Sequence, residues 1–121
     1  MGFGNTAAER AALEATYEDT ANVSRAQNVK VGALTRTSDV PVYTALPCGL
    51  DQSGADGSGQ TGAQNNIDYD ATLFLAPEAD LQPGDRVEVL RLGRTLRFTV
   101  EGRPAVFATH QEVRLKDRDL A

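Results

Sequence analysis

Residues 67–101, IDYDATLFLAPEADLQPGDRVEVLRLGRTLRFTVE, decide the fold. Side chains of a β-strand point alternately to opposite faces, so a half-buried strand carries an apolar residue at every second position. This alternation covers residues 67–75, restarts at Val87 and Val89, and returns over residues 96–100. The stretch therefore predicts three consecutive strands.

Short turns join these three strands. Pro83-Gly84 is typical of a type II turn, in which proline presets φ at the second position and glycine accepts the positive φ of the third. The break at Leu92-Gly93-Arg94 predicts a hairpin connection. Strands joined in this way pair antiparallel, so we predict a mainly β chain folded as a small antiparallel β-barrel or sandwich.

Further extended segments lie on both sides of this stretch. Pro41 has no amide hydrogen for a strand ladder and favours an edge strand. Ser38-Asp39 predicts a turn. The other predicted strands are residues 21–25, 29–35, 40–46, 105–109 and 111–116.

The N-terminal segment predicts the one helix of the chain, from Thr6 to about Glu18. Thr6 and Glu9 fit a capping box, and alanine is abundant without an interrupting Pro or Gly. Leu13 and Tyr17 lie four residues apart on one face, with Phe3 just ahead of the helix. A helix this short needs a surface to pack on. That surface is either the rim of its own β domain or a neighbouring subunit, and we favour a partner interface at Phe3, Leu13 and Tyr17.

Residues 51–66, DQSGADGSGQTGAQNN, predict a long protruding loop inserted between strands. The segment has four glycines, nothing more apolar than alanine, and two acidic residues without a basic one. Such a composition cannot offset the entropy of ordering by burial. A loop of this length in a compact domain is usually functional or disordered. We therefore expect residues 1–20 to form an arm and helix, 21–116 a single β domain carrying this insertion, and 117–121 a charged tail.

Composition excludes several classes of protein. The 121 residues suit one domain, and the net charge of -5 argues against a general binder of nucleic acid or anionic membrane. Cys48 is the only cysteine, so an internal disulfide is impossible and a reducing compartment is expected. No apolar run approaches the ~20 residues of a membrane span. We expect a soluble, cytoplasmic chain.

Five of the ten arginines fall within residues 86–103, interleaved with acidic residues. This pattern is typical of a solvated strand face. The alternative is a contact with a neighbouring subunit, an acidic partner or phosphate, for which Arg91, Arg94 and Arg97 are the candidates.

Candidate catalytic or metal-binding groups are few. His110 is the only histidine, and with Cys48 as the only thiol no His- or Cys-rich metal set is available. Asp68 and Asp70 share a strand face, but no calcium-loop pattern follows them. We predict no active site, no metal site and no cofactor.

Six motifs follow one another along residues 17–116. They are Tyr17-x-Asp19-Thr20-x-x-Val23-x-Arg25, Val42-Tyr43-x-x-Leu46-Pro47-Cys48, Leu73-Phe74-Leu75-Ala76-Pro77, Leu81-x-Pro83-Gly84-Asp85-Arg86-Val87, Gly93-Arg94-Thr95 and Ala108-Thr109-His110-Gln111-Glu112-Val113. In this order they resemble the head-closure (stopper) and minor capsid proteins of long-tailed bacteriophages and prophages.

This resemblance implies a small antiparallel β-barrel with a long inserted loop, assembled as a homo-oligomeric ring of six or twelve copies in the neck of the virion. The ring is built in the bacterial host cytoplasm, between the portal or adaptor above and tail proteins below, without a membrane. It closes the head and gates the channel for double-stranded DNA, which it does not recognise by sequence. The N-terminal helix departs from the family pattern. The implied channel loop consists of Asp51, Gln52, Ser53, Gly54, Asp56, Gly57, Gly59, Gln60, Gly62, Gln64, Asn65 and Asn66.

Other functions remain open at this stage. One is another neck or tail ring component, such as an adaptor or a tail terminator. A second is a small monomeric β-barrel that binds nucleic acid or a peptide, although its aromatic residues suit a core or interface better than base stacking. An enzyme would require turnover that depends on His110.

Overall fold

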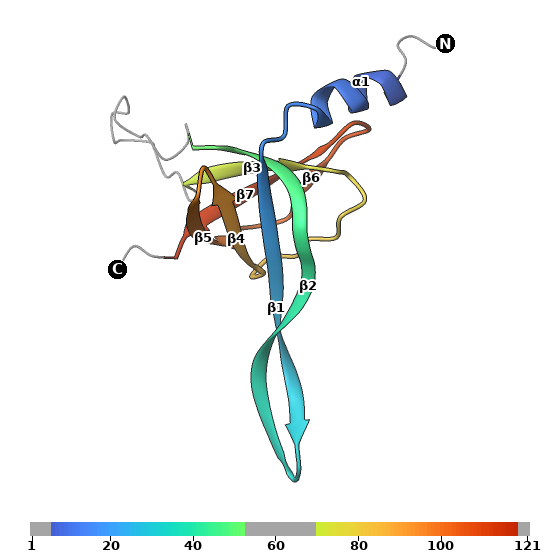
Figure 1. Ribbon diagram of the computed structural model, residues 1–121. Helices are drawn as coiled ribbons and strands as arrows, with labels where there is room; N and C mark the ends of the chain where they lie inside the picture. The colour runs from blue at the N-terminus through green and yellow to red at the C-terminus, as the bar shows by residue number, and fades with distance from the viewer. Residues whose placement is uncertain (1–5, 53–69, 119–121) are drawn as a thin grey trace, which may run out of the picture.

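A computed structural model describes residues 6–52 and 70–118 of the chain. These residues form a mainly β fold with one helix, as predicted (Figure 1). The elements are α1 (Thr6–Glu14), β1 (Asp19–Val31), β2 (Leu34–Asp51), β3 (Ala71–Leu75), β4 (Arg86–Arg91), β5 (Arg94–Val100), β6 (Ala105–Val106) and β7 (Gln111–Asp117).

All seven strands of the described residues belong to one antiparallel sheet that closes on itself. Neighbouring strands follow the order β3-β2-β1-β4-β5-β7-β6, and β3 also pairs with β7. This last pairing joins residues 71–75 to residues 111–115 and brings the two ends of the sheet together. We call the result the closed sheet.

Both predicted turns of the 67–101 stretch are confirmed. Gly84 has a φ of 90°, and the Asp85 amide donates to the Gln82 carbonyl at 3.0 Å. Between β4 and β5 the loop is Leu92-Gly93, with φ values of 50° and 78°. Positive φ at both central residues is the signature of a type I′ turn, whose twist matches that of a hairpin.

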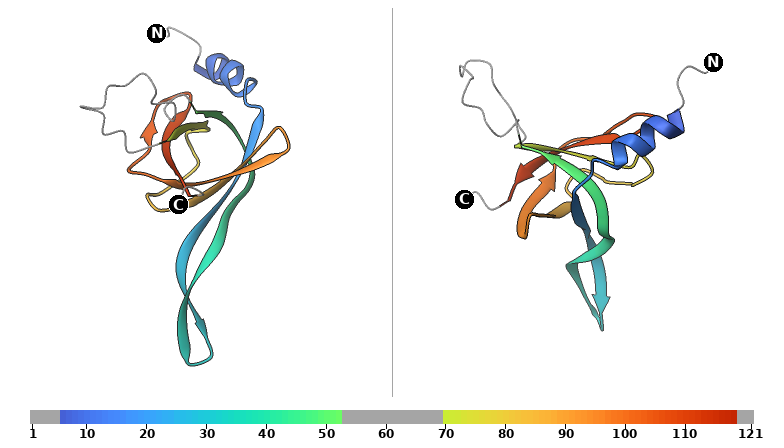
Figure 2. Two further views of the ribbon diagram at one scale, coloured as in Figure 1. Left: turned by 90° about the vertical axis from the view of Figure 1, so that its left-hand side faces the viewer. Right: turned by 45° about the horizontal axis from the view of Figure 1, so that its top comes forward.

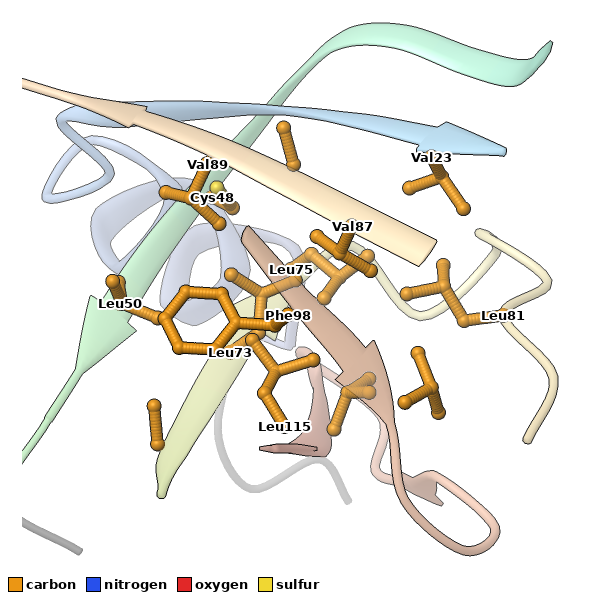
Figure 3. Close-up of a cluster of buried hydrophobic side chains, with 14 residues drawn as sticks. Val23, Cys48, Leu50, Leu73, Leu75, Leu81, Val87, Val89, Phe98 and Leu115 are labelled. Atoms are coloured by element: carbon orange, nitrogen blue, oxygen red, sulfur yellow. The ribbon is translucent and has the colours of Figure 1, made fainter. Parts of the chain in front are cut away.

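The core lies inside the closed sheet and follows the predicted alternation. Ala71, Leu73 and Leu75 of β3 are buried, whereas the two residues between them are only half-buried. Figure 3 shows Leu73 and Leu75 next to the ring of Phe98. The buried apolar set is Ala21, Val23, Cys48, Leu50, Ala71, Leu73, Leu75, Leu81, Val87, Val89, Phe98, Val100, Val113 and Leu115.

The predicted turn at Ser38-Asp39 is wrong. β1 and β2 form one long hairpin, in which Ser38 pairs with Gln27 and the chain reverses only at Gly32-Ala33. Gly32 has a φ of 65°, the conformation that glycine adopts without strain at the start of a two-residue hairpin loop. Cross-strand pairing over twelve registered positions outweighs the local turn preference of Ser-Asp.

β2 bends where the long hairpin enters the closed sheet. The register against β1 shifts on both sides of Val23, so β2 contains extra residues there. Ala45 adopts a φ of 53°, and its amide donates to Asn22 Oδ1 at 2.8 Å. Such bulges bend a strand and increase its twist.

The helix is shorter than predicted. It ends at Glu14, and the following residues form a tight turn in which the Thr16 amide donates to the Leu13 carbonyl at 3.0 Å. The Thr16 hydroxyl also donates to that carbonyl, at 2.6 Å. Threonine therefore satisfies a free carbonyl of the last turn, and β1 begins at Asp19.

A buried ion pair fixes the point where β1 leaves the closed sheet. Asp85 is 1% exposed and accepts from Arg25 Nε and Nη2, both at 2.8 Å. Arg25 also donates to the Asp80 carbonyl at 2.9 Å, and the Gln82 amide donates to Asp85 at 2.9 Å. The strong charge-assisted bonds with Asp85 raise the pKa of Arg25.

We expect Arg25→Met to lower the free energy of unfolding by roughly 2–4 kcal/mol, because it leaves the buried Asp85 carboxylate without its cation. The matched control is Arg86→Met, whose ion pair with Asp39 has both side chains more than a third exposed. That variant should lose at most about 1 kcal/mol. Urea unfolding followed by circular dichroism measures both, and equal losses would contradict this reading.

We also expect stability to fall at alkaline pH because of Cys48, whose burial raises the thiol pKa to about 12. In the unfolded chain a thiol ionises near pH ~8.5. Between these values the unfolded state binds fewer protons than the folded state, so the free energy of unfolding decreases as the pH rises. The fall from about pH 7.5 to about pH 10 should be roughly 1–2 kcal/mol smaller in Cys48→Ala. An identical fall in both proteins would rule out this origin.

Candidate functional site

The rim of the closed sheet holds both ends of the predicted channel loop. Asp51 is the last residue of β2 and pairs with Thr72 of β3. On the other side, the Asp70 amide donates to the Leu115 carbonyl and its carboxylate accepts from the Asp117 amide, both at 2.7 Å. The insertion therefore begins and ends at one place, on adjacent strands.

Only the first two residues of the predicted loop fall within the described part of the chain. Asp51 and Gln52 are exposed. The remaining loop candidates lie outside the described residues: Ser53, Gly54, Asp56, Gly57, Gly59, Gln60, Gly62, Gln64, Asn65 and Asn66.

Helix α1 is tied to the closed sheet by charged groups instead of a buried apolar face. None of its residues is buried, and Arg10 bonds to Glu14 of its own helix and to both carboxylate oxygens of Glu78. Glu78 lies between β3 and β4. The Arg10 bonds lower the pKa of Glu78, and the Glu78 and Glu14 bonds raise that of Arg10.

The residues predicted to form a partner interface do not share one environment in the structure. Tyr17 is half-buried and lies over Gly49 of β2, where an added Cβ would stand 3.4 Å from its ring. Tyr17 therefore packs on the rim of its own sheet, which is one of the two surfaces considered for the helix. Leu13 is half-buried, and Phe3 lies outside the described residues.

A shallow groove separates α1 from β2. It has a volume of about 270 Å³ and is lined by Arg10, Glu14, Tyr17, Leu46, Pro47 and Ala76. The hydroxyl of Tyr17 is buried here and has no hydrogen-bond partner among the described residues. Burial raises the pKa of Tyr17. Removing this hydroxyl from water costs free energy, and no described residue forms the hydrogen bond that would offset that cost.

The structure does not bring the three candidate arginines together. Arg91 and Arg94 are registered partners in the β4–β5 hairpin. Arg91 is turned inward, donating to the Leu50 carbonyl at 2.9 Å and lying 4.0 Å from Asp19. Because side chains alternate along a strand, Arg97 lies on the opposite face from Arg94, 3.4 Å from the Glu88 carboxylate.

His110 belongs to an aromatic cluster on the surface. Its ring stacks on Phe107, with centroids 5.0 Å apart, and lies at an angle to Phe74 at 6.0 Å. Nε2 is 3.0 Å from Glu112, and Nδ1 is 3.1 Å from the Thr109 hydroxyl. Phe107 is 48% exposed, so the cluster offers an aromatic face to solvent.

Two further observations concern metals and membranes. Within residues 6–52 and 70–118, no three His, Cys, Asp or Glu side chains come close enough to hold a metal ion together. In the same residues, no helix has the length and apolar character needed to cross a bilayer.

Sequence reasoning missed the most prominent feature, the outer part of the β1–β2 hairpin. Figure 2 shows it extending away from the remaining strands in both views. The available signal was weak: a polar stretch in which Val29, Val31 and Leu34 are the apolar positions, on either side of Gly32.

Comparison with known proteins identifies a fold and no family. No protein-family model and no curated protein matches the sequence. One solved structure is similar, the solution structure of protein SF1141 from Shigella flexneri 2a, with a TM-score of 0.66 and 13% sequence identity. The alignment covers 87% of this chain and 96% of that one. At this identity the likeness shows a shared fold alone.

We expect Tyr17→Phe to leave the protein equally stable or to stabilise it by up to about 1 kcal/mol, because it removes a buried hydroxyl that no described residue satisfies. Tyr17→Ala is the contrasting variant and should destabilise the protein, since the ring contact with Gly49 is lost. Thermal unfolding of the three proteins tests this pair. A Phe variant less stable than the parent would show that the hydroxyl has a bonding partner.

Proposed function

We propose that this chain is a structural protein of the phage neck, forming a ring between portal or adaptor and tail that closes the head and gates the DNA channel. The observation that carries the proposal is the ordered series of motifs across residues 17–116 that resembles head-closure proteins. The mainly β fold is consistent with what that resemblance implies, whereas helix α1 is not part of the family pattern.

The position of the insertion supports the gating role. Residues 52–70 connect two adjacent strands, and both attachments are fixed by backbone pairing and by the bonds of Asp70. The residues from which the connection starts and to which it returns are therefore held in place at the rim of the closed sheet. In a ring of identical copies, every subunit therefore carries its loop at the same position along the ring axis.

The proposed gate acts by crowding and not by attraction. Residues 51–66 contain Asp51 and Asp56 and no Lys or Arg. Binding to DNA phosphates depends on cations that release counterions. Loops of this composition therefore occupy the channel without adhering to the DNA, and a small displacement of each loop reopens the path.

The proposal predicts that phage heads assembled without this protein release their packaged DNA, and that purified parent protein restores retention. A variant with residues 53–66 replaced by a short Gly-Ser linker should join particles in normal amount and fail to retain DNA, because only the crowding element is missing. Genome retention, measured as nuclease-resistant DNA per particle, is the readout. The exposed substitution Leu92→Asn, on a hairpin turn in the described part of the chain, serves as a control and should behave as the parent.

Several outcomes would overturn the gating role. Full retention by the loop-replaced particles would move the chain to another ring of the neck or tail, such as an adaptor or terminator. A protein absent from purified particles would instead favour a monomeric binding module for nucleic acid or peptide.

A further inference from the structure

The outer part of the β1–β2 hairpin is a two-stranded arm. β1 pairs with β4 only over residues 20–24, and β2 pairs with β3 only over residues 48–51. From residue 25 to residue 40 the two strands pair only with each other, across the Gly32-Ala33 turn, and ion pairs of Arg25 with Asp85 and of Asp39 with Arg86 hold the base of this segment. We call residues 25–40 the arm. Figure 1 shows the arm projecting from the closed sheet. Its seven residues per strand, at the rise of a β-strand, span roughly 23 Å.

The two faces of the arm differ in chemistry. Registered partners of an antiparallel pair lie on the same face. One face therefore carries Val29 beside Arg36, and Val31 beside Leu34. Val31 is 53% exposed and Leu34 is 71% exposed. The opposite face carries Asn28, Lys30, Thr35 and Thr37, which are polar or charged.

An uncovered arm of this kind has little stability of its own. A two-stranded hairpin is marginally stable in water, and both of its outer edges leave strand groups free to pair. Here the tip also exposes three apolar side chains on one face, Val29 less than the other two. The apolar face continues the side of β1 that carries the buried Ala21 and Val23. This arrangement suits a surface that a partner covers.

Charge indicates what that partner is. The arm contributes a net charge of +2 to a chain of net charge -5, so the remaining residues carry -7. Toward the tip, Lys30 and Arg36 form no ion pair with a described residue, and no acidic residue lies between Arg25 and Asp39. Helix α1 lies at the opposite end of the molecule (Figure 2) and carries two Glu and one Arg. Glu9 within the helix and Glu18 just after it are both exposed.

We propose that the arm is the element by which one copy of this chain binds a second copy, with its apolar face and the neighbouring Arg36 set against the acidic surface around α1, while Lys30 on the opposite face adds to the positive charge of the arm. The contact joins different surfaces of the two copies and is heterologous, the type that closes into a ring when the rotation permits. The inference rests on the proposed ring and deepens it by naming the segment that links the subunits.

Double-stranded DNA fits the arm less well than protein does. Two cations neutralise two phosphates, which supplies little of the affinity that DNA-binding proteins obtain from phosphate contacts. Val31 and Leu34 would gain nothing from a phosphate backbone, whereas burial against protein is favourable for apolar side chains.

The test is the self-association of the full chain, measured by sedimentation velocity and native mass spectrometry over a range of concentrations. Val31→Thr combined with Leu34→Thr removes the apolar contact and keeps β-propensity. Lys30→Glu combined with Arg36→Glu reverses the charge. Leu92→Asn is the matched control, since Leu92 is 88% exposed on another hairpin turn and asparagine accepts its positive φ.

Each double variant should raise the concentration needed for half-assembly at least tenfold, whereas the control should assemble as the parent does. Adding Glu9→Lys and Glu18→Lys to the charge-reversed arm should restore assembly, because the two surfaces are then complementary again. Circular dichroism should be unchanged throughout, since the substitutions lie outside the core.

Three results would overturn the inference. A parent protein that remains monomeric at every concentration would show that the arm does not bind a second copy. Arm variants that assemble as well as the parent would show that another surface joins the subunits, and this result would not contradict the proposed ring. An arm that binds duplex DNA, with loss in the charge-reversed variant and no self-association, makes it a DNA contact. Genome retention by particles tests the gating role separately, so the two failures are distinguishable.

Discussion

The pairing of β3 with β7 is the constraint on which the rest of the structure depends. Five consecutive registered pairs join Ala71–Leu75 to Gln111–Leu115, although thirty-five residues separate these two segments in the sequence. Without this pairing the sheet is open and one side of the core around Leu73, Leu75 and Val113 faces water. With it, a short chain of 121 residues encloses a buried apolar core. The same pairing holds the root of the insertion, because Asp70 bonds to Leu115 and Asp117 immediately beside β3.

The Arg25–Asp85 pair marks where the closed sheet ends and the arm begins. On the inner side of this pair, Ala21 and Val23 are buried by strands on both sides. Beyond it, β1 has only β2 as a neighbour, and its side chains are exposed or half-buried. A buried ion pair stabilises less than a well-packed apolar contact, but it has fixed geometry. Its two parallel bonds, together with the Asp80 carbonyl, set the direction in which the arm leaves the body.

Much of this fold was predictable where local and long-range forces agree. In β3, β4 and β5 the apolar alternation reports burial by the closed sheet, and glycine marks turns that require positive φ. The arm was predicted wrongly for the opposite reason: no third strand covers it, so it carries no alternation strong enough to outweigh Ser38-Asp39. The candidate arginines show a similar limit. Arg91, Arg94 and Arg97 are close in sequence, but a strand sends Arg94 and Arg97 to opposite faces, and the Leu50 carbonyl that holds Arg91 lies forty-one residues away.

The molecule separates the parts that make its own core from the parts available to others. The buried apolar core is built by the strands of the closed sheet and by Leu81, while α1 and the arm bury almost nothing of their own. These two elements project at opposite ends and carry opposite charge. Because they bury so little, neither adds much to the free energy of unfolding of the isolated chain. Such elements become stable when a neighbouring subunit covers the surface that they expose in the isolated chain. In a symmetric assembly every copy is both donor and acceptor of that contact, so one cationic arm and one acidic helix per chain suffice to link all subunits.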